Sequence, residues 1–421
     1  MKKFFSLILM ALFVIPCASQ VINSSGGLIG SWAGKLKVGA NALTLVLNVQ
    51  QGDGYLVCTM DSPDQGAKGL NIYKEYLTDD SLSLKVTQIG ATFRARVEEG
   101  KMVGVFSQMG MNFPLTLEKG SYEVRRPQHP VPPYPYKTEE VSFFNKADNA
   151  TLVGTLTYPT RFDRSKQVPV VIMVTGSGLQ NRDEELFNHK PFLVIADYLA
   201  RHGIASLRYD DRAFGASTGG DRVHNQATSL DYKRDAASAI DFLRARNEFS
   251  QVGVIGHSEG GYIAFMLGSE KLVDFVISMA GTGVKGDIVL TSQVNEILKM
   301  QGQTTTLTTE QCRQNALSIP SDWMKWFLDY DPTDDISRTT CPVFALNGDK
   351  DLQVISSLNL HAIKQALPKN EYTLVKEYPG LNHLFQHCKT GLPTEYNMIE
   401  ETISEQVLLD IAQWILSLQE Q

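Results

Sequence analysis

Hydrophobic and polar residues alternate strictly along the first part of the chain, from about residue 21 to residue 123. A period of two is typical of half-buried antiparallel strands, and polar turns such as Gln51-Gly52-Asp53-Gly54 separate the runs. The alternating positions are Leu43, Leu45, Leu47, Val49, Leu82, Leu84, Val86, Phe93, Ala95, Val97, Met102, Gly104, Phe106, Phe113, Leu115 and Leu117. We expect a small antiparallel β-barrel that begins near Trp32 and carries no catalytic group.

The pattern changes beyond residue 136, where short continuous apolar runs alternate with segments of helical periodicity. Buried strands are expected near residues 168–174, 204–209, 252–255, 275–280, 341–346 and 372–375, after a leading hairpin at residues 139–144 and 151–156. Helices are expected at residues 191–202, 231–246 and 356–367, and a last helix is expected to begin with a capping box at Thr402. This alternation predicts an α/β fold with a mostly parallel sheet that is covered on both faces.

Composition divides the chain into two globular parts. Five prolines between residues 125 and 136 exclude a helix or a central strand, and they predict an extended, semi-rigid linker. This linker separates a β-domain at residues 20–124 from an α/β domain at residues 137–421. Within the second domain the regular alternation lapses at residues 284–335, and we expect a helical cap insertion there.

Residues 1–19 have the composition of an export signal peptide. Lys2 and Lys3 precede an apolar run that is too short to span a membrane comfortably, and small residues suited to cleavage follow it. We expect an exported protein, either periplasmic or extracellular. Cys17 suggests lipidation as an alternative, but Pro16 stands where a small residue normally precedes a lipidated cysteine.

Charge and cysteine usage exclude several classes of partner. Without Lys2 and Lys3 the chain has 37 basic and 46 acidic side chains, and this acidic balance argues against nucleic acid. No later apolar run could cross a bilayer and no residues have metal-ligand spacing, so we expect no integral membrane span, no metal and no cofactor. The spacing of the remaining cysteines does not decide whether Cys312 and Cys388 pair; the four are Cys58, Cys312, Cys341 and Cys388.

The sequence Gly256-His257-Ser258-Glu259-Gly260 carries the strongest chemical signal. It follows the apolar run at residues 252–255 and opens into a helical stretch, which is the strand, sharp turn and helix of a nucleophile elbow. The two glycines permit a strained turn that lifts the Ser258 hydroxyl out of the sheet. The free N–H groups of the following helix favour the negative charge that develops when an acyl carbonyl is attacked.

A serine nucleophile needs a base and an orienting carboxylate, and both types of residue occur later in the chain in the required order. The strand near residues 341–346 ends in Gly348-Asp349-Lys350-Asp351, and the strand near residues 372–375 ends in Gly380-Leu381-Asn382-His383. Spacing alone leaves both Asp349 and Asp351 open as the acid. It also leaves His257 and His387 as competitors of His383 for the role of base.

Several loops together resemble those of bacterial α/β-hydrolases, and the two-domain layout resembles the EstD-type carboxylesterases. The segments that carry the resemblance are Gly176-Ser177-Gly178, Arg208 to Arg212, Gly256 to Gly261, Gly348 to Val354 and Gly380 to His383. The resemblance implies an α/β-hydrolase fold and a catalytic triad of Ser258, Asp351 and His383, with Asp349 as the fallback acid. It also implies hydrolysis of carboxylic esters with small to medium acyl chains, which makes a small-molecule ester the expected substrate.

The same resemblance points to two backbone donors of an oxyanion hole. One is the Glu259 N–H, which directly follows the serine. The other lies in the loop after the strand at residues 168–174, which resembles the His-Gly-Ser-Gly-Pro stretch of bacterial esterases. We assign it to the Ser177 N–H, with Gly178 as the next candidate. The nearby segment Asp210 to Arg212 is interpreted as a hydrogen-bonded or ion-paired structural corner.

The expected cap contains a group of aromatic residues, among them Trp323, Trp326 and Phe327. As substrate-binding residues they would shed water from the site and contact an acyl chain. The alternative is that they form the buried faces of the cap helices, because their spacing is that of a packed helix.

Two other functions stay open on the sequence. One is a serine aminopeptidase of the same fold, in which Asp334 and Asp335 in the cap would bind a peptide N-terminus. The other is a non-catalytic protein whose β-domain binds glycan or lipid, although an intact set of triad residues argues against it. The natural substrate, the role of the β-domain and the oligomeric state are left open.

Overall fold

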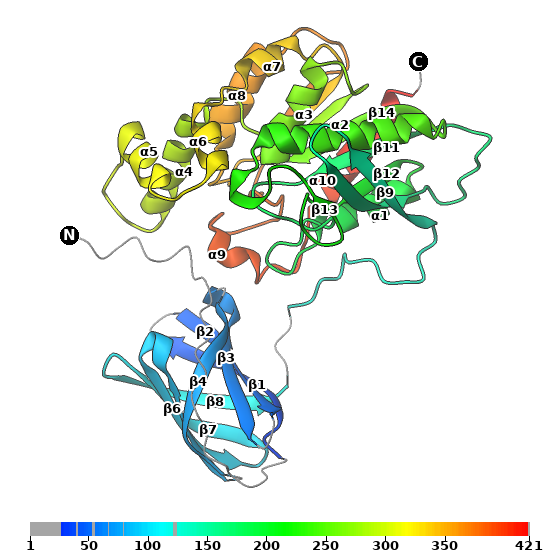
Figure 1. The fold of residues 1–421 in the computed structure, drawn as a ribbon. Helices are drawn as coiled ribbons and strands as arrows, with labels where there is room; N and C mark the ends of the chain where they lie inside the picture. The colour runs from blue at the N-terminus through cyan, green and yellow to red at the C-terminus, as the bar shows by residue number, and fades with distance from the viewer. Residues whose placement is uncertain are drawn as a thin grey trace. The chain divides into compact units, whose positions relative to one another are not determined.

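The computed structural model describes residues 27–38, 41–52, 55–65, 67–78, 80–120 and 124–419. The expected export signal at residues 1–19, with Cys17, lies outside these ranges. The chain divides into two compact units, Met1–Glu123 and Val124–Gln421 (Figure 1). Each unit has a hydrophobic core of its own. No helix in the described ranges combines the length and the apolar character that crossing a bilayer requires.

The first unit is a closed antiparallel barrel in which each strand pairs with the next and the last pairs with the first. Its strands are β1 (Gly30–Val38), β2 (Asn41–Gln51), β3 (Leu56–Ser62), β4 (Ala67–Leu77), β5 (Ser81–Val86), β6 (Ala91–Glu98), β7 (Lys101–Gln108) and β8 (Met111–Lys119). The alternating residues point inward as expected, and Leu47, Leu84 and Phe93 are fully buried. Trp32 also lies inside, where its indole Nε1 donates to the Leu28 carbonyl at 2.8 Å.

The sequence pattern did not single out β3 and β4 as strands. On β4 the pairing register with β5 shifts between Lys74 and Tyr76. A bulge of this kind moves successive side chains to the other face of the sheet, so the period of two is interrupted. Tyr73 and Tyr76 are both exposed, and the strand therefore lacks the alternation that predicted its neighbours.

The second unit is built on a nine-stranded sheet with the order β13-β10-β12-β11-β14-β15-β16-β17, and β9 pairs with β10. Six strands run parallel to one another: β11, β12, β14, β15, β16 and β17. The other three, β9, β10 and β13, run antiparallel to their partners. The bounds are β9 (Thr138–Asn145), β10 (Ala150–Thr157), β11 (Val168–Val174), β12 (Ala205–Tyr209), β13 (Thr218–Gly219), β14 (Phe249–His257), β15 (Val276–Met279), β16 (Val343–Gly348) and β17 (Leu374–Tyr378). The mostly parallel sheet predicted from the sequence is therefore confirmed.

Helices cover both faces of this sheet (Figure 1). On β11, Val170 and Ile172 face a core that includes α2 and α3, whereas Val171 and Met173 face a core that includes α1 and α10. A strand buried on both faces has to be apolar throughout, which explains the continuous apolar runs. The helices are α1 (Pro191–Arg201), α2 (Ser229–Ala245), α3 (Glu259–Ser269), α8 (Ser356–Ala366), α9 (Pro393–Tyr396) and α10 (Glu405–Ser417).

The expected capping box at Thr402 is wrong. Helix α10 begins at Glu405 with Ser404 as its N-cap, and the Thr402 hydroxyl instead contacts Nδ1 of the buried His189 at 3.1 Å. A capping residue must have its side chain free for the first turn, so this tertiary contact excludes the predicted start. A capping box does occur on α2, where Thr228 and Asp231 satisfy each other's backbone N–H groups.

The segment between β15 and β16 forms the expected helical insertion. It contains α4 (Gly286–Met300), α5 (Thr309–Leu317), α6 (Asp322–Asp329) and α7 (Thr333–Arg338) (Figure 1). A Cβ atom at Gly286 would lie 1.9 Å from the Phe327 carbonyl oxygen, so the first turn of α4 packs against α6 without room for a side chain.

The proline-rich segment is attached to the second unit. Arg126 donates to the Asn397 carbonyl at 2.8 Å and to the Ile399 carbonyl at 2.9 Å. Gln128 donates to the Ile403 carbonyl at 2.7 Å. The stretch expected as a linker is therefore anchored by side chain to backbone hydrogen bonds.

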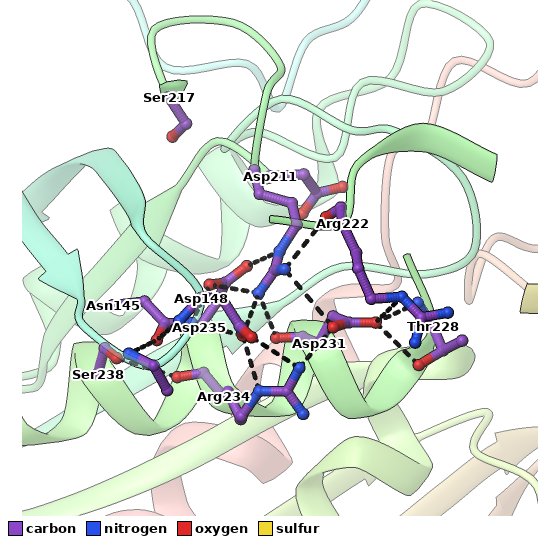
Figure 2. Close-up of polar contacts among 12 residues, drawn as sticks. Asn145, Asp148, Asp211, Ser217, Arg222, Thr228, Asp231, Arg234, Asp235 and Ser238 are labelled. Carbon is purple, nitrogen blue, oxygen red and sulfur yellow. Dashed lines mark hydrogen bonds and ion pairs between the residues drawn. The ribbon is translucent and has the colours of Figure 1, made fainter. Parts of the chain in front are cut away.

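A buried ionic cluster joins the leading hairpin to α2, and Figure 2 shows Asp148, Asp231 and Asp235 converging in it. The Arg212 side chain is fully buried at their centre, with its Nε 2.7 Å from Asp235 Oδ2 and its Nη2 2.9 Å from Asp148 Oδ2. Nη2 also donates to the Asp231 carbonyl at 2.7 Å. Arg212 thus turns away from its sequence neighbours Asp210 and Asp211, although all three are hydrogen-bonded as expected.

The charges of this cluster depend on one another. Burial raises the pKa of Asp148, but hydrogen bonds from Arg234 and Arg212 outweigh it and hold the pKa at about 2. Asp235 is more deeply buried, and desolvation raises its pKa although Arg212 opposes the rise. Arg212 is therefore the cation on which the ionisation of Asp235 depends.

We predict that Arg212→Met destabilises the second unit by about 3–5 kcal/mol, because it leaves the Asp235 carboxylate buried without its cation. Urea denaturation measures the loss. Arg234→Met is the matched control, since that side chain is 37% exposed, and a clearly smaller loss is expected. Equal losses in the two variants would show that the stability contributed by each arginine does not depend on how deeply its side chain is buried.

Candidate active site

Ser258 lies at a sharp turn between β14 and α3. Its backbone has φ 54° and ψ −110°, a left-handed conformation that costs energy for a residue with a side chain. Its N–H donates to the Met279 carbonyl at 2.8 Å. A Cβ atom at Gly256 would lie 1.9 Å from the Gly260 carbonyl oxygen, and one at Gly260 would lie 2.0 Å from the Val174 carbonyl oxygen. The two glycines are thus required because the start of α3 touches the backbone of β14 and β11.

The loop after β11 passes directly beside this turn. A Cβ atom at Gly176 would lie 3.3 Å from Cβ of Ser258. The loop is closed by the buried Asp211, which accepts from the Thr175 hydroxyl at 3.0 Å and from the Gln180 N–H at 2.8 Å. The Gly176 N–H is bonded to Glu184 Oε1 at 2.8 Å, so it already has an acceptor within the protein.

Asp351 and His383 are brought together by the loops that follow β16 and β17. His383 Nδ1 lies 2.7 Å from Asp351 Oδ2, and both residues are buried. The other carboxylate oxygen of Asp351 accepts from the N–H groups of Gln353 and Val354 at 2.8 and 2.9 Å. Asp351 therefore faces the ring with one oxygen while backbone donors hold the other.

The competing acid and base candidates occupy other positions. Asp349 Oδ1 accepts from the Gly380 N–H at 2.6 Å and so braces the turn that precedes His383. His387 is exposed and pairs with Glu401. The choice between neighbouring residues is thus made by which side chain the loop turns inward, and spacing along the chain does not contain that information.

His257, directly before the serine, forms a second pair with a carboxylate. Its Nδ1 lies 2.9 Å from Glu184 Oε1, and its Nε2 lies 2.9 Å from the carbonyl oxygen of His383. Burial lowers the pKa of His257, but the Glu184 charge outweighs it and the pKa is raised. Sequence reasoning missed Glu184, whose only signal is a charged residue in a loop that follows a fully buried strand.

Glu259 connects the serine turn to the cap through its side chain. Its carboxyl group is buried, and Oε1 accepts from the Trp323 indole at 2.8 Å and from the Ser229 hydroxyl at 2.5 Å. Burial raises the pKa of this carboxyl group, although hydrogen bonds from Ser229, Trp323 and Ser177 oppose the rise. The side chain of Glu259 is therefore structural, while its backbone N–H opens the first turn of α3.

The cap aromatics form two stacked ring pairs along α6. Trp323 and Phe327 are parallel with ring centroids 5.0 Å apart, and Trp326 lies 4.6 Å from Tyr330. Trp326 and Phe327 also contact Tyr262 of α3, each at 6.2 Å. These contacts show a packing role for the group, and contact of Trp323, Trp326 or Phe327 with a substrate stays a prediction.

The described residues hold no group of three or more histidine, cysteine, aspartate or glutamate side chains that could bind a metal ion. Within these ranges the cysteines are free thiols, so Cys312 and Cys388 do not pair. Burial raises the pKa of the Cys388 thiol to about 11, which leaves it protonated and unreactive at neutral pH.

Asp210 belongs to a separate ion pair on the far side of the loop after β11. Arg182 contacts Asp210 with two nitrogens, Nε at 3.1 Å and Nη2 at 2.9 Å. The Arg182 N–H also donates to Asp210 Oδ1 at 2.8 Å. Asp210 and Asp211 thus brace the same loop from two points, which agrees with the structural interpretation of the segment.

Comparison with known proteins adds three likenesses. The family model described as "Serine aminopeptidase, S33" matches residues 190–317. Esterase EstD of Thermotoga maritima is 26% identical over 334 residues, which cover 76% of this chain and 74% of that protein. Among solved structures, the ferulic acid complex of Est1E from Butyrivibrio proteoclasticus is 15% identical, with a TM-score of 0.49 over 67% of this chain and 100% of that chain.

A further solved structure is the esterase Pf2001 of Pyrococcus furiosus, which is 17% identical with a TM-score of 0.46 over 71% of this chain and 99% of that chain. The likeness to EstD extends beyond the second unit, since it spans three quarters of both chains. The mostly parallel sheet, the serine turn after β14 and the helical insertion before β16 are the features that the resemblance to α/β-hydrolases predicts. The second unit therefore has the α/β-hydrolase fold, and the chain is similar to esterase EstD, with an antiparallel β-barrel before the hydrolase unit in the sequence.

Proposed function

We propose that this protein is a carboxylic ester hydrolase that acts through a triad of Ser258, His383 and Asp351 and an acyl-enzyme intermediate. The observation that carries the proposal is the 2.7 Å contact between His383 Nδ1 and Asp351 Oδ2, in loops that adjoin the strained serine turn. The similarity to a protein named esterase supports the choice of ester substrates.

The first half of the reaction acylates the serine. Asp351 holds the proton on Nδ1 of His383, so Nε2 is the nitrogen that accepts the proton of the Ser258 hydroxyl as its oxygen attacks the ester carbonyl. The same proton then passes from His383 to the leaving alcohol. In the second half, water attacks the acyl group with His383 again as the base, and Ser258 is released.

The tetrahedral intermediates carry a negative oxygen that needs backbone donors. The Gly176 N–H is bonded to Glu184, so Ser177 supplies the next N–H in the loop after β11. The Glu259 N–H at the start of α3 is the second donor, and the first N–H groups of a helix have no partner within it. Each such donor stabilises the transition state by about 3 kcal/mol in comparable hydrolases.

The expectation of small to medium acyl chains rests on the resemblance of the loops to those of bacterial esterases. The cavity beside the loop after β11, which we call the oxyanion loop, is too small to receive an acyl group. It lies between Gly176, Gly178 and Ile263 and has a volume of about 10 Å³, which is room for about one water molecule. Tyr209 and Tyr232 form part of its wall.

A serine peptidase is the second candidate, because the matching family model is described as an aminopeptidase. The acidic pair expected to bind a peptide N-terminus has other contacts, however. Asp335 accepts from the Ser269 hydroxyl at 2.7 Å and from the Tyr330 hydroxyl at 2.9 Å. Asp334 is 78% exposed and pairs with Arg338. Neither carboxylate is therefore available as a buried partner for an ammonium group.

The triad is tested with p-nitrophenyl butyrate. We expect Ser258→Ala to lower kcat by at least about 10³-fold and Asp351→Asn by about 10³- to 10⁴-fold, since the asparagine no longer fixes the histidine tautomer. Asp349→Asn is the matched control and should lose less than about tenfold, because it only braces the Gly380 turn. Wild-type turnover in Ser258→Ala, with the fold intact by circular dichroism, would disprove the proposal.

The reaction class is tested by comparing p-nitrophenyl esters of increasing acyl length with aminoacyl p-nitroanilides. We expect kcat/KM for acetyl or butyryl esters to exceed that for any anilide by at least about 10²-fold, because neither Asp334 nor Asp335 is available to bind the substrate ammonium group. It should be highest for small to medium acyl chains, as the resemblance to bacterial esterases implies. A preference for the anilides would establish the peptidase instead.

A further inference from the structure

Two histidine–carboxylate pairs lie next to each other at the serine turn, and the mechanism uses only one of them. The rings of His257 and His383 have centroids 4.7 Å apart. His257 connects Glu184 on one side to the backbone carbonyl of His383 on the other, with both contacts at 2.9 Å. Glu184 in turn accepts from the Gly176 N–H at 2.8 Å. A continuous chain of hydrogen bonds therefore links the oxyanion loop to the loop of the base.

The partners of His257 determine where its protons are. A backbone carbonyl only accepts, so the Nε2 that faces the His383 oxygen must carry a hydrogen. Nδ1 faces Glu184 Oε1, and that contact requires one proton between the two atoms. Burial lowers the pKa of His257, but the Glu184 carboxylate outweighs it and raises the pKa, so the proton belongs to the imidazole. The pair is an imidazolium and a carboxylate.

We infer that His257 is a doubly protonated positioning residue, which with Glu184 holds the oxyanion loop and the His383 loop in register on either side of Ser258. The inference rests on the proposed function, because it assigns His257 a purpose in the same reaction. His257 does not touch the reacting atoms. It acts through the backbone of the base and through the carboxylate that orients Gly176.

The surroundings of His257 favour this charged form. The ionisable groups that act on the ring are Glu184, Asp351 and His383, and both carboxylates attract the imidazolium. Phe385 contributes only an aromatic edge at 6.5 Å. His257 and Glu184 are 4% and 1% exposed, so water cannot replace either hydrogen bond when one is lost.

The same chain of bonds explains the assignment of the oxyanion donor. Because Glu184 occupies the Gly176 N–H, this loop contributes its next N–H, that of Ser177, to the site. Loss of Glu184 would free Gly176 to rotate and would release one of the two bonds of His257. Displacement of either loop by about 1 Å is enough to lower a rate by about 10²-fold.

The kinetic test uses His257→Gln, Glu184→Gln and the double variant, with p-nitrophenyl butyrate as substrate. We expect each single variant to lower kcat by about 10- to 100-fold with KM changed by less than about threefold, because geometry and not binding is altered. The kcat of the double variant should lie within about twofold of the kcat of the less active single variant, since the pair acts as one unit. Additive losses would overturn the inference.

His189→Gln is the matched control for loss of a buried histidine. His189 is fully buried and makes the same kinds of contact, to the Thr402 hydroxyl at 3.1 Å and to the Tyr396 carbonyl at 2.9 Å, but it lies outside the site. We expect it to lower the thermal midpoint while kcat stays within about twofold. An equal loss of kcat in His189→Gln would mean that destabilisation alone explains the His257 variants.

A spectroscopic measurement keeps the inference testable where a variant fails to fold. In nitrogen-15 spectra of the wild-type histidine side chains at about pH 7, where an unperturbed imidazole is mostly neutral, both ring nitrogens of His257 should have the shift of protonated nitrogen. One unprotonated ring nitrogen would overturn the inference. Labelling of Ser258 by a fluorophosphonate separates the two proposals. If Ser258 is labelled but kcat is unchanged in the His257 variants, only this inference is rejected. If the wild-type protein shows neither labelling nor turnover, the proposed function is rejected.

Discussion

The backbone at Ser258 is the constraint on which the rest of the site depends. A positive φ at a residue with a side chain costs about 1–3 kcal/mol and persists only where the surroundings enforce it. Here the enforcement is close contact between backbones: α3 touches β14 at Gly256 and β11 at Gly260, and the Ser258 N–H is bonded to β15. Three neighbouring strands thus define one turn. The hydroxyl is held above the sheet because the turn has no other conformation that keeps these contacts.

The loops around the turn are held by buried carboxylates. Asp351 accepts from two backbone N–H groups, Glu184 from one, and Asp211 from one N–H and one hydroxyl. Loop backbone lacks the partners that helices and sheets provide, so each buried N–H needs an acceptor from a side chain. A carboxylate meets this need and also places negative charge beside His257 and His383. The same carboxylates therefore hold the loop backbone in place and provide the negative charge beside the two histidines.

Much of the architecture could be predicted from the sequence because its signals are local. The alternation along β5 and β6 depends only on which face of a strand is buried, and the glycines around Ser258 mark a turn that few other residues permit. The order of Ser258, Asp351 and His383 along the chain likewise predicted that the loops after β16 and β17 lie together, and Asp351 and His383 are in contact there. The wrong start for α10 and the missed strand β4 are cases in which a tertiary contact or a bulge changed the local rule.

What the sequence by itself determined is the two-domain layout, the α/β class and the loops that carry Ser258, Asp351 and His383, because periodicity and turn residues act over a few positions. Only the tertiary structure decided that Asp351 and not Asp349 faces His383, that Glu184 pairs with His257, and that Arg212 turns to Asp235. These choices join residues up to 73 positions apart along the chain. Which side chain turns inward depends on the packing of the whole sheet, and no short stretch of sequence contains that information.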